Sequence, residues 1–142
     1  MFRVICVGLL ITAPALAESR DEYERRKLME SLQGNWAVSN MAVAGMPVSP
    51  GAIQGMGYRF DEDRLVQSNK PEESARLNID VSGPVPKVEY VDRHGMSMVG
   101  IIQRMGDKVY MCMVEAGQEP PTRFSSNTDN KAILIELSRP RR

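Results

Sequence analysis

The spacing of apolar positions in this chain changes near residue 34. Between residues 18 and 33 apolar side chains recur at about the helical period, with charged side chains on the other face. These apolar residues are Tyr23, Leu28, Met29 and Leu32. Ser19 followed by Glu22 has the form of a capping box, and Gly34 is a suitable helix stop. The pattern predicts a short N-terminal amphipathic helix over residues 18–33.

From Asn35 onward the apolar residues follow the strand period, in short runs separated by turn residues. Eight runs predict strands, at residues 35–43, 57–61, 64–68, 75–81, 87–92, 97–105, 108–115 and 131–138. Asp61-Glu62-Asp63 and Met105-Gly106-Asp107 predict tight hairpins, which pair neighbouring strands antiparallel. We found no helical pattern between the runs. The prediction is a mostly β fold, in which residues 34–142 form a single eight-stranded antiparallel barrel, because closure removes exposed edges.

The first 17 residues have the pattern of a secretory signal peptide. Arg3 precedes the apolar run 4–11, which is too short to span a bilayer, and Ala15-Leu16-Ala17 provides the small-x-small exit. We expect cleavage after Ala17 and a periplasmic or secreted product. No later apolar run has the roughly 20 residues of a membrane-spanning helix, so no stable membrane insertion is expected after cleavage.

The near-neutral charge of the chain argues against one class of partner, nucleic acids. The sequence has 18 basic and 18 acidic residues among 142, and removal of the signal peptide takes only Arg3 from this balance. Nucleic-acid binding usually needs a clustered basic excess, so no nucleic-acid partner is expected. The basic tail 139–142 is short enough to be a solvated terminus.

Groups that could carry catalysis are few. His94 is the only histidine, and with Asp92 it lies in a predicted turn, where exposure explains it better than a catalytic dyad. Cys112 is the only cysteine beyond the signal peptide, which excludes an intramolecular disulfide. The carboxylates of residues 61–63 and 72–73 also lie in turns, without the spacing of a calcium loop. We therefore expect no enzyme, no cofactor and no metal site built from these groups.

Four short motifs stand in order along the chain: Leu32-Gln33-Gly34-Asn35-Trp36, residues 106–112, Pro121-Thr122-Arg123-Phe124 and residues 134–139. Together they resemble the lipocalin-like domain of uncharacterised exported proteins of planctomycetes. The resemblance covers residues 32–139. It implies a lipocalin-like barrel of calycin type and supplies no catalytic residues.

The wider lipocalin group implies a structural role for three residues. In that group a Gly-x-Trp on the first strand packs under an arginine that follows the last strand, and the matching residues here are Gly34, Trp36 and Arg139. Such a stack would pin the first strand to the last. Arg123 is a rival partner, and the alternative is a core indole with Arg139 free in solvent.

An eight-stranded barrel is either filled by its own side chains or holds one small ligand. The primary hypothesis is a small apolar ligand bound by interior residues, expected to be Trp36, Val38, Met98, Val109, Met111, Met113 and Ile135. A void of about 300 Å³ or more would favour this hypothesis. One alternative is a filled barrel that contacts an exported protein partner through loops 45–55 and 116–130. Another is a periplasmic copper-handling protein, because Met96-x-Met98 and Met111-x-Met113 pair soft thioethers on two consecutive strands.

Overall fold

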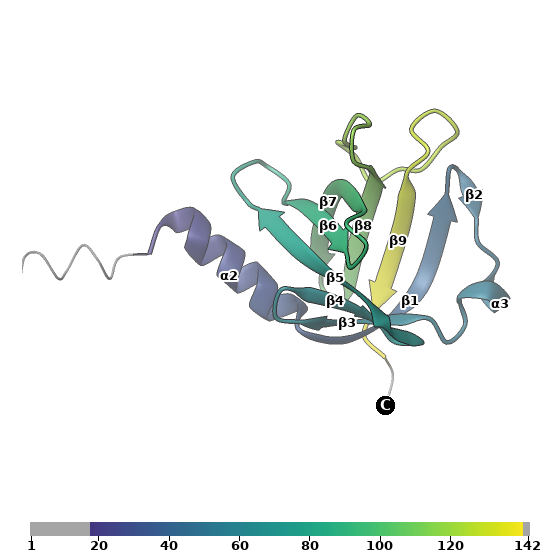
Figure 1. Ribbon diagram of the computed structural model, residues 1–142, viewed down its shortest axis with the longest axis horizontal. Coiled ribbons are helices and arrows are strands. Elements are labelled where there is room, and N and C mark those ends of the chain that lie inside the picture. The colour runs from purple at the N-terminus through teal and green to yellow at the C-terminus, as the bar shows by residue number, and fades with distance from the viewer. Residues whose placement is uncertain (1–17, 141–142) are drawn as a thin grey trace, which may run out of the picture.

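The computed structural model describes residues 18–140, in which the strands form a ring beside one longer helix (Figure 1). The signal-peptide prediction, on residues 1–17, lies outside this range. The elements are helix α2 (Arg20–Leu32), β1 (Gly34–Val43), β2 (Met46–Pro47), helix α3 (Pro50–Ile53), β3 (Gly57–Asp61), β4 (Arg64–Gln67), β5 (Lys70–Asp80), β6 (Lys87–Asp92), β7 (Ser97–Met105), β8 (Lys108–Glu115) and β9 (Ile133–Ser138).

All strand pairings in the ladder are antiparallel, in the order β2-β1-β3-β4-β5-β6-β7-β8-β9. A further pairing of β1 with β9 closes the sheet. Because β2 pairs only with the end of β1, eight strands make the ring and one is extra. The predicted closed antiparallel barrel of eight strands is confirmed.

The segment between β1 and β3 differs from the predicted open loop. It contains strand β2 and the four-residue helix α3, so a short helix does lie between two strands. Pro50 stands at the start of α3, where its fixed φ suits a helix and its missing N–H costs nothing. Ile53 is buried and anchors this single turn. Strand β5 also begins at Lys70, five residues before the predicted start.

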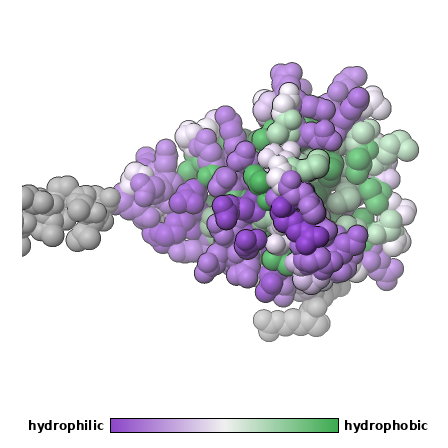
Figure 2. Space-filling model, viewed as in Figure 1, coloured by the Kyte–Doolittle hydropathy of each residue, from purple (hydrophilic) through white to green (hydrophobic). Residues whose placement is uncertain are grey.

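Helix α2 occupies residues 20–32. The expectation that one apolar face of this helix packs on the barrel is wrong over most of the helix length. Of its apolar residues only Leu32 is fully buried, while Tyr23 is 45% exposed. Leu28 and Met29 are partly buried against the core. Figure 2 shows a largely hydrophilic surface over this helix. The apolar contact is confined to the last turns because only these reach the barrel.

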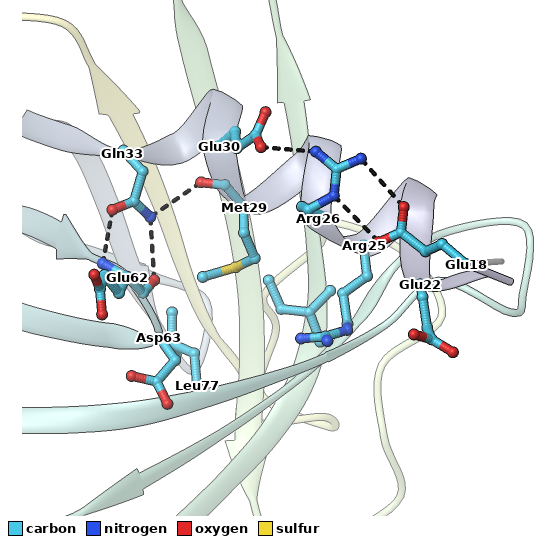
Figure 3. A pocket seen from close by; sticks show the side chains of 11 residues that line it. Glu18, Glu22, Arg25, Arg26, Met29, Glu30, Gln33, Glu62, Asp63 and Leu77 are labelled. Carbon is cyan, nitrogen blue, oxygen red and sulfur yellow. Dashed lines mark hydrogen bonds and ion pairs between the residues drawn. The ribbon is translucent and has the colours of Figure 1, made fainter. Parts of the chain in front are cut away.

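The end of α2 is fastened to the turn between β3 and β4 by one side chain. Gln33 accepts a hydrogen bond from the backbone N–H of Glu62 at 2.6 Å, and its amide group donates to the carbonyls of Glu62 at 3.1 Å and Met29 at 3.0 Å (Figure 3). At the other end, the Ser19 hydroxyl accepts from the Glu22 backbone N–H at 3.1 Å. Both ends of α2 are therefore capped by side chains.

The main core lies mostly inside the barrel. Its buried members are Leu32, Trp36, Val38, Ile53, Phe60, Leu65, Leu77, Ile79, Val88, Ile102, Val109, Met111, Met113 and Leu137. A second cluster contains Ile101, Cys112, Val114 and Ala132, with Phe124 and Leu134 packed against it. Alternation along β8 puts these two sets on opposite faces. The second cluster therefore lies outside the barrel, beneath the connection between β8 and β9.

Gly100 allows β7 and β8 to approach closely. A Cβ at this position would overlap the carbonyl oxygen of Cys112 on β8. We expect Gly100→Ala to lower the free energy of unfolding by about 3 kcal/mol or more, because both strands would have to move. Urea denaturation followed by circular dichroism would measure this change. Gly51→Ala is the matched control, since a Cβ there meets nothing within 4 Å; equal effects of the two substitutions would contradict the argument.

Candidate ligand-binding site

The indole of Trp36 lies at the centre of the closed end of the barrel. It is 1% exposed, and its ring N–H donates to the Leu32 carbonyl at 2.7 Å. The guanidinium carbon of Arg139 lies 3.8 Å from the ring centroid, and that of Arg104 lies 5.4 Å away. Two cations therefore face one indole, an attractive arrangement because of the negative ring face.

The same two arginines supply hydrogen-bond donors to the end of α2. Arg139 donates to the Ser31 carbonyl at 3.4 Å and to the Asn35 carbonyl at 3.2 Å. Arg104 also donates to the Ser31 carbonyl, and to that of Gly106 at 3.0 Å. A helix leaves its last carbonyls without partners, and positive charge there is favourable. Partial burial, and then the charge of Arg104, lower the pKa of Arg139 from its usual range.

The structure places Arg139, and not Arg123, over the indole. Arg123 is exposed in the connection after β8. Gly34 has a φ of +104°, and a Cβ there would come within 3.1 Å of Arg139 Nη1, so glycine leaves room for the stack. Sequence reasoning missed Arg104. The available signal was its position two residues after Ile102, which puts a charged side chain on the inner face at the end of β7.

A cavity of about 140 Å³ lies in the other half of the barrel. Its walls are Met41, Tyr58, Leu65, Tyr90, Met98, Met111, Met113, Ile133 and Ile135. Four of the seven predicted ligand-binding residues are among them: Met98, Met111, Met113 and Ile135. The other three, Trp36, Val38 and Val109, are at most 7% exposed and belong to the packed core outside this wall. The predicted residues thus divide between core and cavity.

Met41 enters the cavity because of an irregularity in β1. The pairing of β1 with β9 shifts between Val38 and Asn40, so that Met41 lies opposite Ile135. Val38 belongs to the inner cluster, and strict alternation would next turn Asn40 inward. One extra residue reverses that alternation and turns Met41 inward instead. A bulge of this kind leaves no clear mark in the sequence, which explains why Met41 was missed.

Two tyrosines bring polar side chains to the cavity wall. Tyr58 on β3 and Tyr90 on β6 have no hydrogen-bond partner for their hydroxyl groups within residues 18–140. Burial raises the pKa of Tyr58. Burial, and then the nearby Tyr58 hydroxyl, raise the pKa of Tyr90. Both phenols therefore stay neutral at ordinary pH, and the cavity carries no charged wall residue.

Two of the surface hollows have volumes near 400 Å³. A cleft of about 390 Å³ lies between α2 and the barrel, and it is lined by charged side chains and by the apolar Leu77 and Ile79 of β5. Figure 3 shows the charged side chains of α2 on one side of this cleft and Leu77 on the other. Arg26 in this cleft pairs with Glu18 at 3.2 Å and with Glu30 at 3.0 Å, so these charges largely satisfy one another. A basin of about 400 Å³ lies within residues 118–130. Neither hollow contains a set of groups suited to catalysis.

The His94 turn has a structural explanation. Asp92 Oδ1 accepts the backbone N–H groups of His94 and Met96, both at 2.9 Å, so the carboxylate closes the turn rather than orienting the imidazole. His94 itself is exposed and accepts a bond from Arg93 at 3.3 Å. Among residues 18–140 no three His, Cys, Asp or Glu side chains gather in a way that could hold a metal ion.

Comparison of the chain with protein families, with curated proteins and with solved structures returned no match. In the described part of the chain, no helix has the length and apolar character needed to cross a bilayer.

Trp36→Ala tests whether the indole supports the closed end. We expect the free energy of unfolding to fall by about 3 to 5 kcal/mol, because a fully buried aromatic side chain is removed. Chemical denaturation would measure this loss. A loss below about 1 kcal/mol would show that the indole does not belong to the core.

Arg139→Ala tests the stack separately. Loss of the cation over the indole and of two hydrogen bonds to carbonyls is expected to lower stability by about 1 to 2 kcal/mol. Arg59→Ala is the control, because its ion pair with Asp61 is 4.0 Å long and exposed; we expect less than about 0.5 kcal/mol from it. Equal losses in denaturation experiments would assign no special role to Arg139.

Proposed function

We propose that this protein is an exported binding protein of lipocalin-like type, which holds a small apolar molecule in the open half of its barrel. The single observation that carries the proposal is the cavity of about 140 Å³. Its wall residues come from every strand of the ring except β5. Thioethers, aliphatic side chains and two tyrosines line it, which is the usual character of a small-molecule pocket.

The cavity volume limits the size of the ligand. The cavity of about 140 Å³ does not reach the sequence-based expectation of about 300 Å³ or more for ligand binding, which is the size of pockets for drug-sized molecules. It is close to the roughly 150 Å³ of an engineered apolar cavity that binds benzene or xenon. A ligand of about one ring therefore fits the space available. Methionine side chains adapt their shape easily, which suits such a site.

The closed end supports the lipocalin-like assignment. A Gly-x-Trp on the first strand of the ring and an arginine after the last strand meet in a stack, as the resemblance implies. Export remains part of the proposal because its basis is the pattern of residues 1–17.

A protein-interaction module is the second candidate, because the two loops assigned to it contact each other. The backbone N–H of Gly45 donates to the Ser126 hydroxyl at 2.8 Å, and Ala44 N–H donates to the Ala132 carbonyl at 3.0 Å. Apolar surface gathers where β1, β2 and α3 meet solvent (Figure 2), and Met46 there is 70% exposed. The loops 45–55 and 116–130 therefore meet at Gly45 and Ser126.

Met111→Trp separates these candidates. Met111 is 1% exposed and lines the cavity, so a larger side chain should fill the space and abolish benzene binding while the barrel remains folded. Chemical shifts of the methionine methyl groups during a benzene titration would measure binding. Met105→Trp is the control, since Met105 is 59% exposed and lies outside the cavity.

The expected outcome is binding by the wild type and by Met105→Trp, and none by Met111→Trp. No methyl shifts in the wild type would remove the main support for the ligand-binding function and favour the interaction module. Binding that persists in folded Met111→Trp would place the ligand elsewhere.

A further inference from the structure

Four thioether groups line the barrel cavity. Met41 comes from β1, Met98 from β7, and Met111 and Met113 from β8. Methionine sulfur is a soft, neutral donor, and thioether and thiolate ligands select Cu(I) over harder ions. A single cavity that gathers four such groups is therefore a candidate metal site as well as an apolar pocket.

The strand register makes Met113 a neighbour of both Met98 and Met111, whereas Met98 and Met111 are four register positions apart. Met111 and Met113 are two positions apart on β8 and share its inner face. Met113 lies opposite Gly100, and Met98 lies two residues before this glycine on β7. Diagonal neighbours of this kind are within reach of long side chains. Gly100 contributes no side chain between Met98 and Met113.

Met41 faces the group from the next part of the ring. It lies opposite Ile135 on β9, and Ile135 lies opposite Met111 on β8. All of these residues line the same cavity. The sequence-based copper hypothesis used the pair Met96-x-Met98, but Met96 is 63% exposed and lies outside both β7 and the cavity. In the folded protein the fourth thioether at the cavity is therefore that of Met41 and not that of Met96.

The rest of the wall favours a soft monovalent cation. No carboxylate, imidazole or thiol lines the cavity, so harder ions such as Zn²⁺ and Ca²⁺ lack the ligands that they prefer. The faces of aromatic rings attract cations, and Tyr58 and Tyr90 complete the wall. Thioethers carry no proton that a metal must displace, so binding should vary little between about pH 5 and 8.

We propose that the barrel cavity binds one Cu(I) ion on the thioether sulfurs of Met98 and Met113, with Met111 and Met41 as further thioethers of the same wall. The inference rests on the proposed function in one respect, namely that the cavity is open to a ligand. It names a second class of occupant for that cavity, and it predicts competition between Cu(I) and a small apolar molecule.

Substitution by leucine separates the two classes of occupant. Leucine has nearly the volume of methionine but no sulfur, so Met98→Leu/Met111→Leu/Met113→Leu keeps an apolar cavity and removes the donors. The matched control is Met46→Leu/Met96→Leu/Met105→Leu, which changes three exposed methionines. All proteins carry Cys6→Ala and Cys112→Ala, so that no thiol remains in the chain.

Cu(I) affinity is measured under reducing, oxygen-free conditions by competition with a chromogenic Cu(I) chelator, and benzene binding is measured by NMR on the same samples. At other metal sites, removal of a residue that only supports a ligand lowers metal affinity up to about 100-fold. The cavity variant loses the ligands themselves, so its Cu(I) affinity should fall by more than this. The exposed variant should keep the wild-type affinity. Both variants should still bind benzene, and Cu(I) should displace benzene from the wild type.

Each contrary result has one meaning. Failure of the wild type to take Cu(I) from the chelator would overturn the metal site, as would full Cu(I) affinity in the cavity variant or its loss in the exposed variant. Binding of benzene without Cu(I) would leave the apolar-ligand function standing alone. Binding of Cu(I) without benzene would support the metal site and overturn the apolar-ligand function.

Discussion

The carbonyl groups at the end of α2 determine how the barrel is closed. Ser31 and Leu32 present these carbonyls to the barrel end, where an unpaired polar group would carry a penalty of a few kcal/mol. The Trp36 N–H and the guanidinium groups of Arg104 and Arg139 satisfy them. Helix α2, β1, β7 and the residue after β9 therefore meet in one set of contacts, and each group in it satisfies or stacks on another.

This closure divides the barrel into two unequal halves. Around the indole the core is fully packed, since Phe60, Ile102 and Leu137 are at most 1% exposed. Towards the other end Met98 and Ile135 are only partly buried, and the cavity lies between them. With the polar closure at one end, the other end can keep an apolar hollow. The location of the candidate site thus follows from the location of the helix end.

The sequence predicted the ring well because its signals are local: strand periodicity and turn residues fix most of the strands. The parts that it missed depend on long-range contacts. The inward turn of Met41 comes from a bulge, and the stability of α3 comes from burial of Ile53. Arg104 shares the indole with Arg139 only because β7 and β9 both end beside α2. Which interior residues line a cavity depends on strand stagger, which periodicity does not reveal.

The second cluster, outside the barrel, holds the buried thiol of Cys112 away from the thioethers of the cavity. Cys112 is fully buried on the outer face of β8, and its sulfur donates to the Ser125 carbonyl at 3.3 Å. Burial raises the pKa of this thiol and outweighs the opposite effect of the Ser125 contact, so the reactive thiolate is disfavoured. The neighbours Met111 and Met113 point to the opposite face and line the cavity. Alternation along β8 therefore puts the thiol of Cys112 on the outer face, beneath the connection to β9, and the thioethers of Met111 and Met113 on the inner face. Oxidation of the thiol would then take place outside the cavity and would not interfere with a ligand bound inside it.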